Sequence, residues 1–425
     1  MVLKGKGKNF VRALSWSVLQ SAVKVVGNFT MGKLVALWFG PAGLAMVGQF
    51  QNLFFLQQSA TGGAVQNGVI QGVAHSETDH QQQRLVIESG AAITFLLTLL
   101  FSGIWIFGSV WIRGHWLAND FPPLVYYFLP ISLVFSSGFF LVSGYFSALK
   151  NYQSNAWINI IQSVSTVALF AVFGKIWGIY GACFGLLLGQ IPAVIWGFRA
   201  FKKFFSVRLS LRWPKKQENG MWNFALLALY SAIATQLNQL LIRTHLTEQF
   251  SEVQAGYWEA LQRISNLWVP VVSVLFTSLF LPRLTQRKLR NEFMKDTFLT
   301  VVAAGGLVFL FSVSVFGVKE WLMEWLFSKE FTSAKDMMGL HLMGDVLKAM
   351  TWSFAYALLS RKKSIALLVI DLLFNVLYYG LVVSLSNHGD WTGAILAYPL
   401  AMVVNLCATI GFWAVILTKQ PISHE

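Results

Sequence analysis

Basic side chains lie inside apolar stretches of this 425-residue chain, where solubility does not require them. A Lys or Arg at the centre of a bilayer costs roughly 2.5–3.5 kcal/mol on insertion scales, so each one is expected to face a wet cavity or a partner. The residues concerned are Lys24, Lys33, Arg263 and Lys348. Coulomb attraction is far stronger in a partly desolvated site than in water, so this set predicts a cavity for an anion, and paired cations suit phosphate groups.

Helical spacing places further polar residues on the same faces as these cations. Lys24 has Gln20 and Asn28 four residues to either side. Two longer faces follow i, i+3, i+4 or i+7 spacing: Glu259, Gln262, Arg263 and Asn266, and then His341, Asp345, Lys348 and Trp352. Shorter sets lie in other apolar stretches: Gln236, Gln239 and Arg243; Asp371 and Asn375; Asn155, Asn159 and Gln162; Gln49, Asn52, Gln66 and Asn67. Buried carboxylates can be protonated, so Glu259, Asp345 and Asp371 are predicted coupling residues.

Structural explanations compete with these functional ones. Asp345 with Lys348, and Glu259 with Arg263, also have the spacing of intrahelical salt bridges that only let a helix insert. The Asn and Gln residues fit interhelical hydrogen bonds equally well.

Two basic residues have a positional alternative of their own. Lys33 is half a turn out of phase with Lys24 and near its helix end, where a lysine can extend to the interface. Arg243 ends its apolar stretch, which favours an interfacial position.

The elements that carry these residues are membrane spans. The chain is 56% hydrophobic and only 12% charged, whereas soluble domains are about a quarter charged. Its apolar blocks are about 20 residues or longer, enough to cross a hydrocarbon core. We expect spans at 11–37, 43–71, 85–111, 123–148, 153–173, 178–198, 220–242, 255–282, 297–318, 338–360, 364–385 and 391–418. The predicted fold class is an all-α integral membrane protein with about twelve transmembrane helices.

The net charge of +14 is explained by the orientation of the chain in a membrane rather than by a nucleic-acid partner. With the N-terminus in the cytoplasm, 22 of the 32 Lys and Arg residues lie on that side, six on the other and four within the spans. This asymmetry is the positive-inside rule. It predicts that both termini are cytoplasmic, and it argues against a nucleic-acid partner.

An internal repeat at an offset of about 212 residues divides the chain into halves. Gly43-Leu44 and Gly256-Tyr257 open equivalent spans, and so do Gly181-Ala182 and Gly393-Ala394. An even number of spans per half makes the halves parallel repeats, an arrangement common in transporters with a site near mid-membrane. The predicted organisation is a six-helix bundle at 1–204, a basic cytoplasmic connector at 205–219 and a second six-helix bundle at 220–425.

Several kinds of chemistry lack their sequence signals. Cys183 and Cys407 both fall within spans, which predicts neither a disulfide framework nor a metal site. No GxxxxGK[ST] loop is present, so we expect no cofactor and no built-in ATPase. The basic, then apolar start is longer than a signal-peptide core and lacks a cleavage pattern, so it is interpreted as an uncleaved first helix.

Short motifs in both halves resemble a known family. They are Gly32-Lys33-Leu34, Phe39-Gly40-Pro41-Ala42-Gly43-Leu44, Val73-Ala74-His75 with Gln81-Gln82-Gln83-Arg84, Leu281-Pro282-Arg283-Leu284-Thr285 and Gly344-Asp345-Val346-Leu347-Lys348. Together they resemble Wzx-type flippases of the multidrug/oligosaccharidyl-lipid/polysaccharide (MOP) exporter superfamily. The similarity is greatest to the branch that flips the lipid intermediate of enterobacterial common antigen (lipid III), followed by O-antigen flippases.

The resemblance implies two six-helix bundles in a V and a substrate of undecaprenyl-pyrophosphate-linked oligosaccharide, moved from the cytoplasmic to the periplasmic leaflet of a bacterial inner membrane. A polysaccharide polymerase and a chain-length regulator are candidate partners beside the membrane lipids. The family's cavity is cationic. This carries over to Lys24, Asp345 and Lys348 by position, whereas Arg263 rests on its helical face.

The hypothesis that follows is transport by alternating access, without an enzymatic reaction. Predicted substrate-binding residues are Lys24, Asn28, Lys33, Arg263 and Lys348, and Glu259, Asp345 and Asp371 would couple transport to an ion gradient. Three alternatives stay open: a proton- or sodium-coupled multidrug exporter of the same superfamily, a major-facilitator carrier, and an envelope polymerase or ligase. The exporter should have an acid-lined site for cationic drugs. A major-facilitator carrier should have a pattern rich in Gly, Asp and Arg or Lys after its second span, which this sequence lacks. The envelope enzyme would need a large outer loop.

Overall fold

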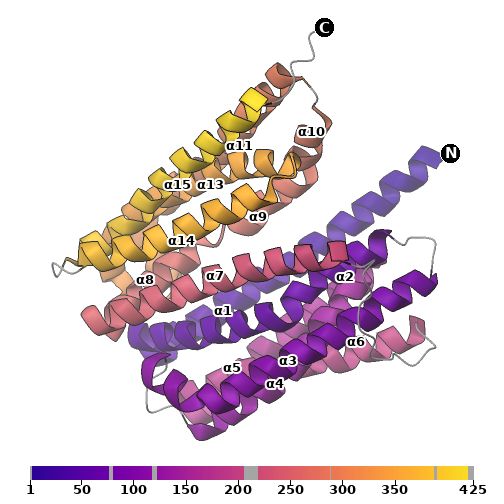
Figure 1. Ribbon diagram of the computed structural model, residues 1–425. Helices are drawn as coiled ribbons and strands as arrows, with labels where there is room; N and C mark the ends of the chain where they lie inside the picture. The colour runs from indigo at the N-terminus through magenta and orange to yellow at the C-terminus, as the bar shows by residue number, and fades with distance from the viewer. Residues whose placement is uncertain are drawn as a thin grey trace. The chain divides into compact units, whose positions relative to one another are not determined.

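The computed structural model describes residues 2–75, 80–116, 122–204, 219–287, 289–386 and 390–419, and all regular structure within them is helical (Figure 1). The chain divides into two compact units: residues 1–39 with 46–240, and residues 40–45 with 241–425. They are called here the N-terminal and C-terminal units. The predicted connector at 205–219 lies, apart from Asn219, outside the described residues.

The elements follow the order expected for an all-helical membrane protein. The N-terminal unit contains most of α1 (Val2–Gln58), η1 (Ser59–Gly63), α2 (Ala64–His75), α3 (His80–Trp116), α4 (Pro123–Ala148), α5 (Tyr152–Leu188), α6 (Ile191–Phe204) and the larger part of α7 (Asn219–Gln249). The C-terminal unit contains α8 (Glu252–Ser265), α9 (Val269–Leu275), η3 (Phe276–Phe280), α10 (Leu281–Gln286), α11 (Arg290–Gly317), α12 (Lys319–Leu326), η4 (Lys329–Ala334), α13 (Lys335–Ser360), α14 (Ser364–Ser386) and α15 (Trp391–Lys419).

Two glycines divide long helices into separate passes. α1 is interrupted at Gly40 (φ 64°, ψ −164°), directly before Pro41, and α5 at Gly178 (φ 64°, ψ −149°). This backbone region is essentially restricted to glycine. α1 therefore holds the first expected span and the start of the second, and α5 holds the fifth and the start of the sixth.

Seven described helical runs are long and apolar enough to cross a membrane. Two of them, Ser15–Ile70 with 56 residues and Tyr152–Phe201 with 50, are long enough for two passes each. The other three expected spans coincide with α7, α8–α10 and α13, whose polar residues lower their hydropathy. All twelve expected spans are thus helical.

Each unit is built around one central helix. α4 packs against α2, α3, α5 and α6, and α13 packs against α8, α11, α14 and α15. Both central helices end in the same way: Lys150 (φ 57°) and Lys362 (φ 58°) are left-handed. The following amide donates to a carbonyl five residues back, from Asn151 to Phe146 and from Lys363 to Leu358. These are Schellman caps at an offset of 212 residues, in agreement with the sequence repeat.

The connection expected at 319–338 is short and helical. α12 and η4 fill it, and the Lys335 ammonium donates to Glu320 across 2.8 Å. This hydrogen bond lowers the pKa of Glu320. The segment therefore consists of two short helices, α12 and η4, in the C-terminal unit. An envelope enzyme would need a large outer loop at such a position.

Candidate functional site

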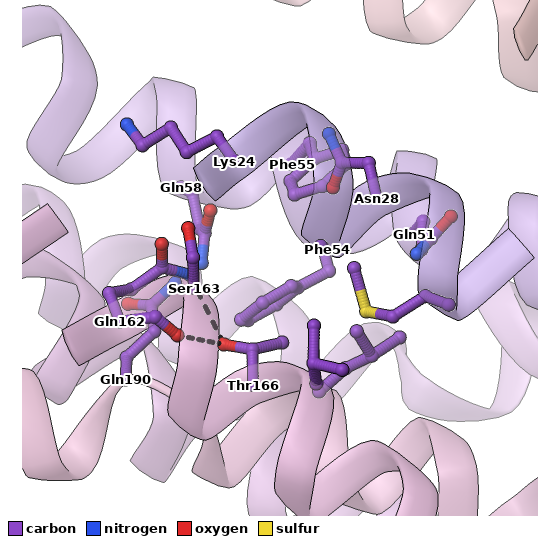
Figure 2. A pocket seen from close by; sticks show the side chains of 14 residues that line it. Lys24, Asn28, Gln51, Phe54, Phe55, Gln58, Gln162, Ser163, Thr166 and Gln190 are labelled. Atoms are coloured by element: carbon purple, nitrogen blue, oxygen red, sulfur yellow. Dashed lines mark hydrogen bonds between the residues drawn. The ribbon is translucent and has the colours of Figure 1, made fainter. Parts of the chain in front are cut away.

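A cavity of about 150 Å³ lies within the N-terminal unit, between α1 and the α5–α6 region (Figure 2). It is called here the amide cavity. Its lining residues come from both parts of α1, from α5 and from the turn after α5: Lys24, Gly27, Asn28, Met31, Gln51, Phe54, Phe55, Gln58, Gln162, Ser163, Thr166, Val167, Leu186 and Gln190. Residues far apart in sequence thus line one polar cavity, at whose edge Lys24 and Asn28 are exposed.

Helical spacing explains how α1 supplies the polar lining. Lys24 and Asn28 are one turn apart on the first part, and Gln51 and Gln58 are two turns apart on the second. The Gln58 amide donates to Ser136 on α4 across 3.1 Å, which orients its side chain. The Gly40 corner lets both parts of α1 line the same cavity.

α5 and the turn that follows it supply the opposite wall. Gln162 donates to the Thr166 hydroxyl across 3.2 Å, a contact drawn in Figure 2. Gln190 follows Gly189, whose carbonyl accepts from Ser165 across 2.5 Å. The Gln190 side chain is only 4% exposed, and its Oε1 has no hydrogen-bond partner among the described residues. The wall of the cavity therefore contains a buried acceptor that has no hydrogen-bond partner within the described part of the chain.

The charge of this lining is simple. Among the lining residues that the structure describes, Lys24 is the one charged member and five are carboxamides: Asn28, Gln51, Gln58, Gln162 and Gln190. None of the described lining residues is a carboxylate. The arrangement can hold an anion at one point and many hydroxyl groups around it.

The C-terminal unit contains a second polar centre, which is an ion-paired triad. Glu259 on α8 accepts from Arg243 on α7 and from Arg263 across 2.9 Å. Arg243 is only 2% exposed and lies over the Trp258 ring, with its guanidinium carbon 5.4 Å from the ring centroid. One carboxylate between two guanidinium groups leaves the triad with a net positive charge.

Asp345 forms the other part of this polar centre. It is fully buried on α13, and Oδ1 accepts from the Tyr398 hydroxyl across 3.1 Å. Oδ2 has no hydrogen-bond partner among the described residues, and neither do the ring nitrogens of His341, which stacks on Tyr398 at 4.6 Å. The Lys348 ammonium lies 5.6 Å from the Trp268 ring centroid and 5.5 Å from that of Trp352.

The predicted site residues therefore fall into separate groups. Lys24 and Asn28 line the amide cavity, whereas half-buried Lys33 is not among its lining residues. Glu259 and Arg263 form the intrahelical ion pair that their spacing allowed, and Arg243 joins them.

The two other predicted carboxylate positions differ from each other. No ion pair joins Asp345 and Lys348 among the described residues: Asp345 accepts from Tyr398, and the Lys348 ammonium lies near the rings of Trp268 and Trp352. Asp371 is half-buried on α14, and its carbonyl accepts from Asn375.

Sequence reasoning missed several of these contributors. Gln51, Gln58 and Gln190 line the cavity. The amides that the sequence analysis named in the second span, Gln49, Asn52, Gln66 and Asn67, are not among the described lining residues. The spacing of Gln51 and Gln58, at i and i+7, was a detectable signal. Arg243 is buried against Glu259 on another helix, a partner that its place at the end of an apolar stretch does not indicate.

No protein-family model matches the sequence. The chain is 24% identical over 357 residues to the lipid III flippases of Escherichia coli (strain K12) and Shigella flexneri, covering 83% of this chain and 86% of each relative. The predicted resemblance is confirmed by these relatives.

Solved structures show the same fold. An inward-facing multidrug resistance MATE family transporter of the MOP superfamily superposes with a TM-score of 0.77 at 12% identity, covering 95% of this chain and 99% of that one. The lipid II flippase MurJ, in an inward closed conformation, gives 0.65 at 14% identity, with 94% and 87% covered. The chain therefore has the all-α membrane fold of the MOP superfamily.

Proposed function

We propose that this chain is a flippase that moves undecaprenyl-pyrophosphate-linked oligosaccharide from the cytoplasmic to the periplasmic leaflet by alternating access. The process is transport rather than catalysis, and it serves surface polysaccharide synthesis, of enterobacterial common antigen or O-antigen. Similarity to lipid III flippases over 83% of the chain supports the substrate class. The observation that carries the proposal is the amide cavity, which offers a cation and five carboxamides to a phosphorylated sugar.

In this proposal, the polar headgroup enters the protein while the polyprenyl tail stays in lipid. Lys24 contacts phosphate oxygens, and Asn28 stands one turn away from it. Arg263, in the ion-paired triad, and Lys348, beside Trp268 and Trp352, supply further positive charge in the C-terminal unit. Lys33 is assigned an auxiliary role near its helix end.

A multidrug exporter is the second candidate, because MATE transporters share the fold. Such a carrier of cationic drugs should present carboxylates to its ligand. None of the described residues lining the amide cavity is a carboxylate, and its charged residue is Lys24. The lining therefore favours an anionic headgroup over a cationic drug.

Among the three predicted coupling carboxylates, we assign the role to Asp345. Both carboxylate oxygens of Glu259 already accept from arginines, so protonation there would break an ion pair. Asp345 accepts from the neutral Tyr398 hydroxyl, and its Oδ2 has no hydrogen-bond partner within the described part of the chain, so a proton on Oδ2 would break no ion pair there. Asp371, half-buried on α14, is the secondary candidate.

The chain is assigned to the bacterial inner membrane with both termini cytoplasmic, as the distribution of Lys and Arg favours. A polysaccharide polymerase and a chain-length regulator would receive the product on the periplasmic side.

Deletion of the gene tests the assignment in cells. The expected result is accumulation of one lipid-linked oligosaccharide in the cytoplasmic leaflet, with loss of the corresponding surface polymer. Unchanged leaflet distribution and unchanged polymer would reject the function. Expression of the intact chain should restore both.

A further inference from the structure

We propose that the amide cavity is a subsite for a glycosyl phosphate, in which Lys24 contacts the phosphate and the carboxamides hold the sugar ring next to it. The inference rests on the proposed function and identifies which part of the headgroup this site takes. It assigns recognition roles to Gln51, Gln58, Gln162 and Gln190.

Amides outnumber cations in the amide cavity. A bare phosphate or pyrophosphate accepts hydrogen bonds and favours several cations, whereas the described lining residues include one lysine and five carboxamides. Each carboxamide offers both a donor and an acceptor, which matches sugar hydroxyls that also do both. Ser163 and Thr166 add two hydroxyls of the same dual character.

Gln190 supplies an acceptor without a hydrogen-bond partner among the described residues. Its side chain is 96% buried and lines the cavity, yet Oε1 has no partner among the described residues. A buried polar atom without a partner costs about 1–3 kcal/mol. A sugar hydroxyl that donates to this atom would remove that cost on binding, whereas an ionised phosphate oxygen, which only accepts, would not.

The backbone position of Gln190 is fixed before any ligand binds. A Cβ at Gly189 would come within 2.6 Å of the Thr166 Cα, so this turn lies directly against α5. The Ser165 hydroxyl also donates to the Gly189 carbonyl across 2.5 Å. A polar group held rigidly before binding loses little entropy when the ligand arrives.

Size and apolar contacts favour one sugar ring. The cavity of about 150 Å³ is smaller than the roughly 300–1,000 Å³ of sites for drug-sized ligands. Phe54, Phe55 and Leu186 provide apolar surface for the C–H faces of a ring, as Figure 2 shows for the two phenylalanines beside Asn28 and Thr166. The rest of the oligosaccharide would remain outside this subsite.

The chain offers a matched control for Gln190. Gln57 is also 4% exposed, and its Oε1 also lacks a partner among the described residues, but it does not line the cavity. Gln190→Leu and Gln57→Leu therefore remove equivalent buried amides, and only the first should affect a ligand in the cavity.

The test is binding of soluble probes to the full chain in lipid nanodiscs, measured by calorimetry. The probes are glucose 1-phosphate, N-acetylglucosamine 1-phosphate and inorganic phosphate. We expect both glycosyl phosphates to bind more tightly than inorganic phosphate. Gln190→Leu should weaken both about tenfold, since one net hydrogen bond changes affinity by about that factor, and should leave inorganic phosphate unchanged. Lys24→Gln should weaken all three, and Gln57→Leu none.

Three results would overturn the subsite: no probe binds, inorganic phosphate binds as tightly as the glycosyl phosphates, or the two Gln→Leu variants behave alike. Lipid-linked oligosaccharide transport in vesicles is measured separately. Binding that depends on Gln190 without any transport would reject the flippase function and retain the subsite. Transport by the intact chain without Gln190-dependent binding would reject the subsite and retain the flippase function.

Discussion

The Tyr398 hydroxyl donates to the buried Asp345 carboxylate across 3.1 Å, joining α15 to α13 in the C-terminal unit. The neighbouring residue makes this contact possible, because any Cβ at Gly344 would overlap the Tyr398 ring. The Gly344-Asp345 pair within the recognised motif therefore has a structural explanation. The glycine admits the tyrosine, and the tyrosine satisfies the carboxylate.

Gly344→Ala should displace Tyr398 and leave Asp345 without its donor. We expect loss of about 1–3 kcal/mol in the free energy of unfolding, the cost of an unsatisfied buried group, together with slower transport. Denaturation by sodium dodecyl sulfate measures the first. Gly380→Ala is the control, since a Cβ there would meet no neighbouring atom within 4 Å. Equal stability of the two variants would contradict this account.

Asp345→Asn keeps the shape of the side chain and removes its titration. If Asp345 couples transport to a proton gradient, vesicles containing this variant should lose the acceleration that an imposed gradient gives the intact chain. The double variant with Asp371→Asn tests both candidate positions. Unchanged, gradient-dependent transport by the double variant would remove the coupling role from both.

The buried triad predicts an unequal pair of arginine variants. Arg243→Ala leaves Glu259 with one partner and opens space beneath Trp258, so we expect a loss near 3 kcal/mol, the lower end for breaking a buried ion pair. Arg263→Ala should cost less, because the side chain is 16% exposed and the Arg243–Glu259 pair stays intact. Measured unfolding free energies in the opposite order would show that the triad is described wrongly.

The corner in α5 gives a test of backbone conformation alone. A Cβ at Gly178 would meet no atom within 4 Å, yet its φ of 64° disfavours other residues. Gly178→Ala should therefore destabilise the protein by about 1–3 kcal/mol. Gly306→Ala, within α11 and equally unobstructed, should be neutral or stabilising by up to about 1 kcal/mol. Thermal unfolding in detergent compares them, and equal melting temperatures would contradict the role of the corner.

Much of the fold could be predicted because each span is encoded locally. Hydropathy and length identify the passes. The 212-residue repeat is also visible in the backbone, because Lys150 and Lys362 form equivalent helix caps. The cation of the amide cavity was also detectable, since Lys24 lies in an apolar stretch with Asn28 on its face.

The remaining features depend on contacts between distant helices. Glu259 lies 16 residues from Arg243, and Tyr398 lies 53 from Asp345, so no helical period relates the members of either pair. Gln190 resembled an isolated polar residue between apolar runs, and only the packing of its turn against Thr166 places it in the cavity. Tertiary structure therefore decides which amides are available to a ligand.

Translocation of lipid-linked oligosaccharide in vesicles containing the purified chain tests the central claim most directly. The intact chain should move the headgroup across the bilayer well above the rate in protein-free vesicles. Lys24→Gln should slow transport at least tenfold, as expected for losing a charged hydrogen bond, while Lys175→Gln, at an exposed lysine of α5, should not. Transport no faster than in protein-free vesicles, or Lys24→Gln as fast as the intact chain, would contradict the account.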